Sequence, residues 1–233
     1  MHLDFAYIIC SVISFVVAIV FHETAHGFAA YKLGDPTAKR AGRLSLNPAK
    51  HIDPFGTVIL PLALMLLGWP VFGYAKPVPY NPRYFKDPRK GDFLVGIAGP
   101  LANVLLAAAA GVVAHVLFGA YVPLYSGGSL SGGAGLAFEY VLGMFLPMFA
   151  LVNLYLAFFN LLPIPPLDGS SIFALVIPRK YLPKYYSVQR YALPVFMIVI
   201  VVVPYVTGFN PFSWYLDATA GNVANLLFPF RVS

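Results

Sequence analysis

The sequence predicts an all-α polytopic membrane protein, with about five to six transmembrane helices and a re-entrant element that includes an extended or β segment. Of its 233 residues, 59% are hydrophobic and only 10% are charged, and the mean hydropathy is +0.76. A soluble domain of ordinary composition carries about 25% charged residues. We therefore expect a single integral membrane domain over residues 1–233. Its core is expected at 5–177, and residues 178–233 are expected to add C-terminal membrane segments.

The net charge of +6 comes from 15 Lys and Arg against 9 Asp and Glu. In a membrane protein, this excess indicates loops that face anionic lipid and the cytoplasm. The sequence contains no P-loop and no basic groove interleaved with aromatic residues, so we expect the lipid bilayer as a partner and no nucleic acid. The single cysteine, Cys10, excludes an intramolecular disulfide and a cysteine-based zinc site. The N-terminal residues lack a basic stretch and a cleavage site, so we expect the first apolar segment to be retained.

The first apolar segment runs from about Phe5 to Tyr31 and is long enough to span a membrane. It contains the sequence His22-Glu23-Thr24-Ala25-His26. On a helix, the two histidines lie on one face about one turn apart, so both imidazoles can bind one Zn²⁺ ion. Glu23 is placed to take a proton from a metal-bound water. Such a motif also arises by chance, but within hydrocarbon these polar residues are costly unless they bind something, which favours the metal site.

The polar stretch from Lys32 to Asp53 is basic, and by the positive-inside rule it faces the cytoplasm. The N-terminus is then outside. His22 precedes Lys32 by about 15 Å of helical rise, so the metal is expected within the bilayer and nearer to the basic side. We therefore predict a multi-pass protein of the cell membrane whose active site opens toward the cytoplasm.

The stretch from Pro54 to Tyr80 is predicted to form the re-entrant element. The apolar run at 58–67 is short and broken by Pro61, and both flanks are basic, so one full crossing would place a basic flank outside. A short helix that enters the membrane and an extended return over Val71–Tyr80 fit better, because the X-Pro pairs there favour extended backbone. Beside a metal, such an edge could pair with a substrate strand. A plain loop packed on the helices is the alternative.

The next two expected spans carry the rest of the candidate site. In the span from about Gly91 to Phe118, small residues between Gly96 and Asn103 allow close helix packing, and Asn103 needs a hydrogen-bond partner inside the bundle. The span from about Leu136 to Leu162 is broken by three prolines, and Asp168 follows them. A catalytic zinc site needs a third protein ligand, and an unpaired carboxylate at membrane depth needs a cation, so Asp168 is the best candidate.

The residues beyond 177 predict further membrane segments. A basic stretch from Arg179 to Arg190 is expected in the cytoplasm, and a fifth span follows at about Tyr191–Val206. The apolar tail from Asn210 to Phe230 is either a weak sixth span or a helix that lies in the membrane interface.

With these motifs in place, the chain resembles the site-2 protease family, the intramembrane zinc metalloproteases of peptidase family M50, in its compact prokaryotic type without PDZ or CBS domains. Three runs between residues 5 and 177 carry the resemblance: His22 to His26, Gly99-Pro100-Leu101-Ala102-Asn103, and Asn160 through Leu167-Asp168-Gly169. The resemblance implies one Zn²⁺ ion per chain, bound by His22, His26 and Asp168, with Glu23 as the catalytic residue that activates water. It also implies that Asn160 helps to hold the substrate or the developing oxyanion. A buried amide that caps the broken helix is the alternative for Asn160.

His51 stands in the run His51-Ile52-Asp53-Pro54-Phe55-Gly56, which resembles one seen in compact members but is not part of the minimal family pattern. His51 could approach the site as an oxyanion donor or a gate. The sequence favours the other interpretation, a polar loop residue at the membrane surface.

The sequence thus predicts a zinc metalloendopeptidase that hydrolyses a peptide bond in or near a transmembrane segment of a membrane protein substrate, as in regulated intramembrane proteolysis. Two alternatives stay open. One is a non-proteolytic membrane protein that uses the metal in a scaffold or a permeation path, where Glu23 is hard to explain. The other is a membrane zinc hydrolase that acts on a non-peptide substrate by the same chemistry.

Overall fold

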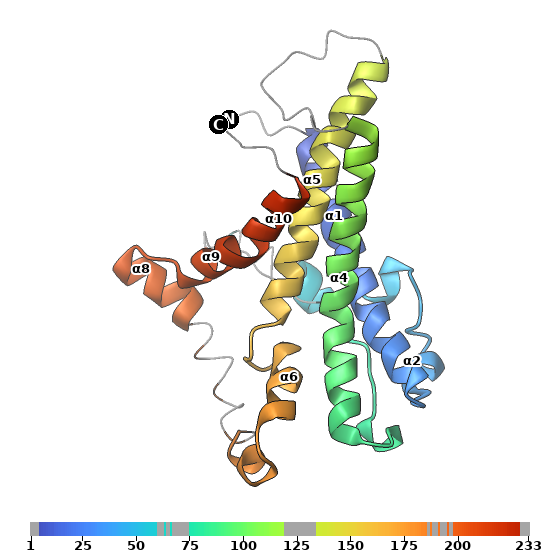
Figure 1. Ribbon diagram of the computed structural model, residues 1–233, viewed down its shortest axis with the longest axis vertical. Helices are drawn as coiled ribbons and strands as arrows, with labels where there is room; N and C mark the ends of the chain where they lie inside the picture. The colour runs from blue at the N-terminus through green and yellow to red at the C-terminus, as the bar shows by residue number, and fades with distance from the viewer. Residues whose placement is uncertain are drawn as a thin grey trace.

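The computed structural model describes residues 5–59, 75–118, 134–185 and 198–228, together with the isolated residues 63, 66, 187, 191 and 195. Over these residues the chain forms helices joined by turns, and no strand occurs among them. Three long helices run along the longest axis of the molecule (Figure 1). They are α1 (Phe5–Lys32), α4 (Pro88–Phe118) and α5 (Ala134–Asn160).

The shorter elements connect and flank these three helices. Between α1 and α4 the described residues form α2 (Thr37–Arg40), η1 (Pro48–Lys50), η2 (Pro54–Ile59) and η3 (Pro82–Tyr84). After α5 they form α6 (Gly169–Val176), η4 (Arg179–Tyr181), η5 (Ile198–Val202), α8 (Val203–Thr207), α9 (Pro211–Leu216), η6 (Asp217–Gly221) and α10 (Asn222–Leu227).

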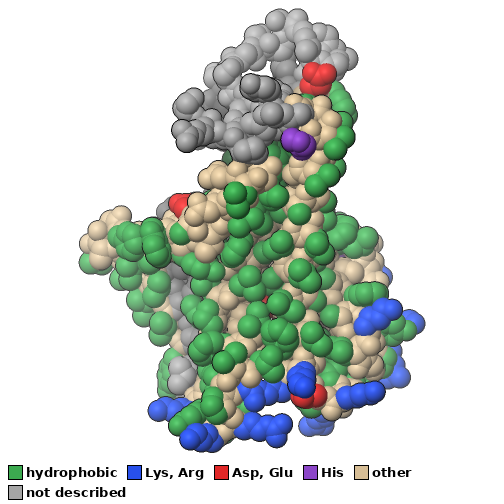
Figure 2. Space-filling view, in the orientation of Figure 1, with side chains coloured by type: hydrophobic (Ala, Val, Ile, Leu, Met, Phe, Trp, Pro, Cys, Tyr) green, Lys and Arg blue, Asp and Glu red, His purple; other side chains and the backbone are tan. Residues whose placement is uncertain are grey.

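The three long helices pack against one another, and α6 packs on the first half of α4 (Figure 1). Small side chains of α4, among them Ala107 and Ala110, face Leu146 and Leu154 of α5 in one buried cluster. Small residues at such an interface let two helices approach closely, which is how helices associate in a membrane. Of the C-terminal helices, α9, η6 and α10 lie against the same bundle, and Ala220 of η6 belongs to this cluster. One core cluster therefore sits between α4 and α5, a smaller one holds Ala30, Phe85 and Val95, and the outer faces of α4 and α5 remain apolar (Figure 2).

Among the described residues, three helices are long and apolar enough to cross a membrane: Phe5–Lys32, Pro88–Phe118 and Val141–Asn160. They coincide with three of the spans expected from the sequence. The expected total of five to six stays a prediction, because residues 192–194, 196 and 197 of the fifth span lie outside the described residues. The same holds for the re-entrant element, since most of residues 60–74 are not described. Residues 75–80 are described, and they contain no strand.

The basic side chains gather at one end of the molecule (Figure 2). At this end α1 finishes with Lys32, α4 begins with Arg89 and Lys90, and η4 carries Arg179 and Lys180. The charge pattern therefore gives the bundle two chemically different ends, one basic and one with few charges.

Candidate metal centre

The two motif histidines lie in the C-terminal half of α1, a helix of 28 residues. This stretch is uninterrupted by proline, so i to i+4 spacing places His22 and His26 on one face as expected. Both side chains are buried, and their rings meet edge to face with centroids 4.6 Å apart. The sequence prediction that one face of this helix presents two imidazoles is therefore confirmed.

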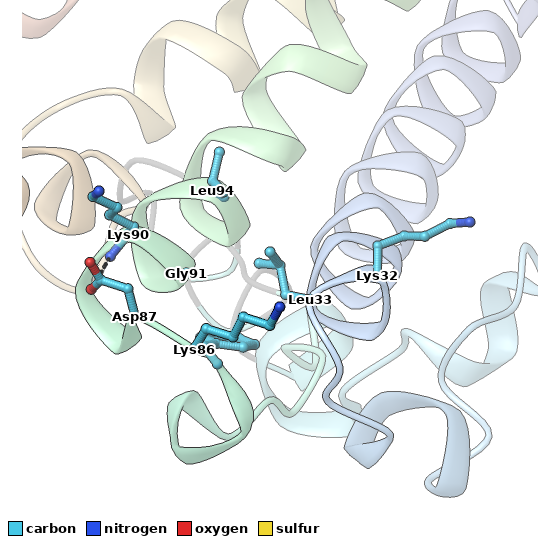
Figure 3. A pocket seen from close by; sticks show the side chains of 8 residues that line it. Lys32, Leu33, Lys86, Asp87, Lys90, Gly91 and Leu94 are labelled. Atoms are coloured by element: carbon cyan, nitrogen blue, oxygen red, sulfur yellow. Dashed lines mark hydrogen bonds between the residues drawn. The ribbon is translucent and has the colours of Figure 1, made fainter.

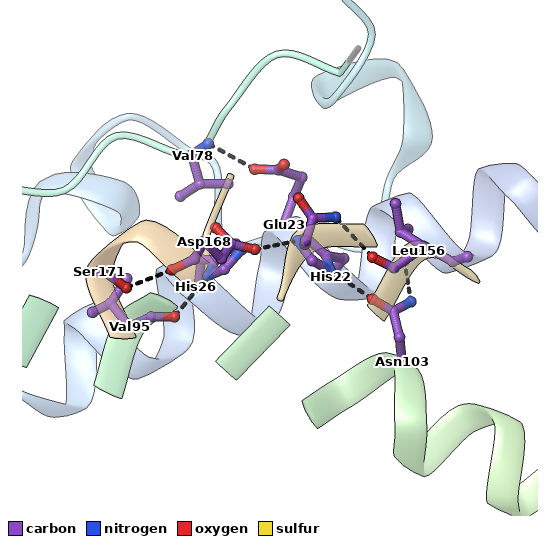
Figure 4. A network of polar contacts seen from close by, with 11 residues as sticks. His22, Glu23, His26, Val78, Val95, Asn103, Leu156, Asp168 and Ser171 are labelled. Atoms are coloured by element: carbon purple, nitrogen blue, oxygen red, sulfur yellow. Dashed lines mark hydrogen bonds and ion pairs between the residues drawn. The ribbon is translucent and has the colours of Figure 1, made fainter. Parts of the chain in front are cut away.

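Asp168 reaches the same point from a distant part of the chain. The chain turns after α5 ends at Asn160, and Asp168 immediately precedes α6. Its Oδ2 atom lies 3.0 Å from Nε2 of His22 and 3.3 Å from Nε2 of His26. The ligand atoms of the three residues all lie within 4.8 Å of one another, a group that could hold a metal ion (Figure 4).

The second nitrogen of each imidazole is held by α4. Nδ1 of His26 donates to the backbone oxygen of Val95 at 2.7 Å. Nδ1 of His22 lies 2.6 Å from Oδ1 of Asn103, whose Nδ2 donates to Ala18 O at 3.0 Å and to Asn153 Oδ1 at 2.8 Å. Because the amide nitrogen of Asn103 is the donor in two bonds, its oxygen accepts the proton of His22 Nδ1.

These hydrogen bonds decide what the site can hold. With both protons on Nδ1, each Nε2 directs a lone pair toward the carboxylate of Asp168. Three acceptor atoms that converge in a buried place repel one another unless a cation lies between them. Two neutral imidazoles and a carboxylate are a ligand set that Zn²⁺ prefers, and hydrogen bonds to the second ring nitrogen are typical of zinc-binding histidines. The residues present therefore fit a zinc ion.

Glycine on α4 permits this close approach. A Cβ atom on Gly99 would collide with Nε2 of His26 and would lie 2.7 Å from Cε1 of His22. A Cβ atom on Gly96 would collide with Oγ of Ser171 on α6. The small residues that the sequence assigned to helix packing thus have a more specific effect: they let α4 touch both histidine rings and the helix that follows Asp168.

Glu23 lies next to this group and contacts the segment that follows residue 74. Its Oε2 atom accepts the backbone N–H of Val78 at 2.9 Å (Figure 4). The same segment is anchored on both sides of Val78. Arg43 donates to the carbonyl oxygen of Lys76, and the fully buried Asp35 accepts the N–H of Asn81 at 2.6 Å. Hydrogen bonds between the backbone and the side chains of Glu23, Arg43 and Asp35 therefore hold residues 76–81 in place.

The two remaining site predictions, Asn160 and His51, lie outside the group of three ligands. The Asn160 amide donates to Leu156 O, one turn back on its own helix, at 2.9 Å. His51 is 2% exposed, and its Nε2 donates to Ser45 O at 2.7 Å. Thr24, the neighbour of Glu23 on α1, donates to the same oxygen at 3.0 Å. His51 is thus buried against the loop that contacts α1, whereas a role at the site stays a prediction for both residues.

Two partners of the histidines were not identified from the sequence. Asn103 was expected to need a partner, but not to be the partner of His22. The signal was available, because Asn103 lies four residues after Gly99 and so shares its helix face. The role of the Val95 carbonyl could not be predicted from the sequence, since every residue has a backbone carbonyl group.

A separate cavity of about 360 Å³ lies at the basic end, between the end of α1 and the start of α4 (Figure 3). Lys32, Lys86 and Lys90 line its edge, and Phe85 lines it as well. None of its lining residues belongs to the group of His22, His26 and Asp168.

The chain is similar in sequence to known proteins of one peptidase family. The model of peptidase family M50 matches residues 10–203. YwhC of Bacillus subtilis, a proposed zinc metalloprotease, is 42% identical over 190 residues, which cover 82% of this chain and 79% of YwhC. Rip2 of Mycolicibacterium smegmatis, also a proposed zinc metalloprotease, is 32% identical over 66% of this chain and 52% of Rip2. Rip2 of Mycobacterium tuberculosis is 29% identical over 87% of this chain and 71% of Rip2. No solved structure matches the chain.

Proposed function

The chain belongs to peptidase family M50, and from this premise we propose that it hydrolyses a peptide bond in or beside a transmembrane segment of another membrane protein. Family membership and the names of the relatives identify a zinc metalloprotease, and the long apolar helices fit a multi-pass membrane protein. The observation that carries the proposal is the meeting of His22 and His26 with Asp168, which follows His22 by 146 residues, beside Glu23.

In this proposal His22, His26 and Asp168 bind one Zn²⁺ ion per chain, and Glu23 is the general base. When bound, the ion supplies Lewis-acid chemistry that acidifies a water molecule and polarises the scissile carbonyl. Glu23 takes the proton of the attacking water and returns it to the leaving amine. Because Oε2 of Glu23 accepts the N–H of Val78, we assign the proton transfer to Oε1. The burial of both histidines keeps bulk water away from their side of the site.

The substrate must present an unwound stretch to this site. A transmembrane helix hides its carbonyl oxygens in i to i−4 hydrogen bonds, so local unwinding has to precede attack. We propose that the unwound stretch lies alongside residues 75–80, because this segment is anchored next to Glu23. Of the expected extended segment, residues 71–74 lie outside the described residues.

We further propose one membrane domain over residues 1–233, with the N-terminus outside and the site open to the cytoplasm. The support is electrostatic: basic side chains lie at the end where α1 finishes and α4 begins, and basic loops stay on the cytoplasmic side. Cytoplasmic accessibility of a cysteine placed at Lys39 would test this orientation.

Glu23→Gln tests the proposed reaction, because the amide keeps the shape of the side chain but cannot take a proton. We expect the purified variant to retain zinc and to lose about 10²–10⁴-fold in cleavage rate of single-span membrane segments in vesicles, the range that general bases contribute. Glu139→Gln makes the same chemical change at an exposed position of α5 and serves as the control. A Glu23→Gln variant that cleaves at the wild-type rate would show that the mechanism is wrong.

A further inference from the structure

Arg89 forms a set of hydrogen bonds that the reaction described above does not use. It lies near the start of α4, and its guanidinium reaches the last turn of α6. Nε donates to Ala174 O at 3.0 Å, and Nη2 donates to Ala174 O at 2.6 Å and to Leu175 O at 2.7 Å. Nη2 also donates to Ile177 O. One side chain thus donates to three backbone carbonyl groups at the C-terminal end of α6, the helix that begins after Asp168.

These carbonyl groups are the ones that a helix leaves without partners inside itself. An arginine at a helix C-terminus supplies both hydrogen bonds and a positive charge opposite the negative end of the helix dipole. Such external hydrogen bonds matter more than usual for α6, because this helix has only 8 residues. Isolated helices shorter than about 12–15 residues are marginal in water, so packing rather than internal bonding fixes the position of α6.

α6 is attached to α4 at both of its ends. At its start, Ser171 donates from Oγ to Asp168 O at 2.7 Å and lies against Gly96. At its end, Arg89 binds the carbonyls. Arg89 and Gly96 are separated by about 10.5 Å of helical rise along α4, close to the roughly 12 Å length of an 8-residue helix. The two attachments therefore fix α6 along its whole length against α4.

The same helix orients the other two ligands. α4 binds His26 through the Val95 carbonyl and His22 through Asn103. Through Arg89 and Gly96, α4 also contacts α6, the helix that follows Asp168. α4 therefore contacts both histidines and the helix that supports Asp168. From this arrangement, and resting on the zinc site proposed above, we propose that Arg89 is a positioning residue for Asp168: by holding α6 against α4, it sets where the Asp168 carboxylate lies relative to the two imidazoles.

The test uses the full-length, detergent-purified protein and four forms of it: wild type, Arg89→Gln, Arg89→Lys and Lys90→Gln. Lys90 is the next residue on α4 and its side chain is exposed, so Lys90→Gln removes the same charge without touching α6. Zinc retention is titrated against a chelator. We expect Arg89→Gln to bind zinc about 10–100-fold more weakly than wild type, which is the range for groups that orient metal ligands. The zinc affinity of Arg89→Lys should fall between those of wild type and Arg89→Gln, because lysine keeps the positive charge but lacks the planar guanidinium group. Lys90→Gln should match wild type.

A second measurement separates positioning from general stability. Co²⁺ replaces zinc in each form, and its visible absorption reports the ligand geometry. A residue that only stabilises the fold leaves this spectrum unchanged, whereas a displaced Asp168 changes it. With Asp168→Asn as a fifth form for reference, we expect Arg89→Gln to shift the Co²⁺ spectrum in the same direction as Asp168→Asn does. If Arg89→Gln fails to fold, the Arg89→Lys spectrum and affinity decide in the same way.

The outcomes distinguish this inference from the proposed function. Wild-type zinc affinity and an unchanged Co²⁺ spectrum in Arg89→Gln would overturn the role of Arg89 while leaving the zinc site intact. An equal loss in Lys90→Gln would also overturn it, because charge alone would then be the cause. A wild-type protein that binds no zinc would remove the proposed function itself, and this inference with it.

Discussion

The two halves of the candidate site are built in different ways. The histidine half lies on one continuous 28-residue helix, and each ring is fixed by a buried hydrogen bond to α4. The carboxylate half lies in a connection interrupted by prolines, its side chain is 21% exposed, and the short α6 supports it. The first half is thus set by helix periodicity and the second by packing. Ligands placed by local structure are recognisable in a sequence, whereas a ligand placed by packing depends on residues far from it.

Removal of one ligand from each half should expose this difference most strongly. His22→Ala and Asp168→Ala are both expected to lose zinc and cleavage. In metal-free protein, His22→Ala should lower the free energy of unfolding by about 1–3 kcal/mol, because it leaves Oδ1 of the fully buried Asn103 without its donor. Asp168→Ala should leave stability unchanged or raise it, since it removes a carboxylate that faces two lone pairs. Chelator-treated protein in detergent, followed through denaturant unfolding, checks both. Equal losses in the free energy of unfolding would contradict this expectation, and would mean that both halves of the site contribute equally to stability.

The helix that joins the halves should be the next most sensitive place. Gly99→Ala puts a methyl group into the two histidine rings, so we expect a loss of about 1–3 kcal/mol in stability, as for other overpacked sites, together with weaker zinc binding. Gly111→Ala is the matched control on the same helix, where the new Cβ atom would come no closer than 3.2 Å to Leu227. Thermal unfolding and zinc titration of both variants provide the comparison. A similar loss in both would assign the effect to helix packing in general rather than to the site.

Asn160 should give the smallest effect. Its amide donates to its own helix, so Asn160→Ala is expected to retain zinc and to change kcat/KM less than tenfold. An oxyanion donor contributes about 10²–10³-fold in kcat, so the two roles are well separated. A hundredfold fall in kcat with normal zinc content would show that the amide turns toward the substrate during catalysis, as the family resemblance implies.

Elements that follow from local patterns were predicted well from the sequence. The first span was expected at Phe5 to Tyr31 and α1 ends one residue later, because both its apolar length and its motif are local. The third span was expected from Gly91, but α4 begins at Pro88. Hydropathy detects the part of a helix that lies in lipid, and this helix continues into the polar region. The convergence of Asp168 with the two histidines was also predicted, from the cost of an unpaired carboxylate at membrane depth.

Three other features that depend on packing, unlike the position of Asp168, were not predicted. Arg89 stands in a basic stretch of the sequence, and no local pattern indicates its contact with α6, which crosses 85 residues or more of sequence. His51 was interpreted as a surface residue, yet it is buried, because a loop between helices can fold back on α1 without any periodic signal. Asp35 stands between Gly34 and Pro36, and its bond to Asn81 connects two loops that lie 46 residues apart in the sequence.

The separation of the ligands along the chain has a consequence for biosynthesis. The ribosome makes His22 146 residues before Asp168, and translation proceeds at about 5–20 residues per second. For several seconds, therefore, a nascent chain carries both histidines and Glu23 in the membrane without the third ligand. Asp168 joins them only after α4 and α5 have been inserted. Under the proposed function, a chain made in this order completes its set of metal ligands, and with it the capacity for hydrolysis, only after α4 and α5 have been made.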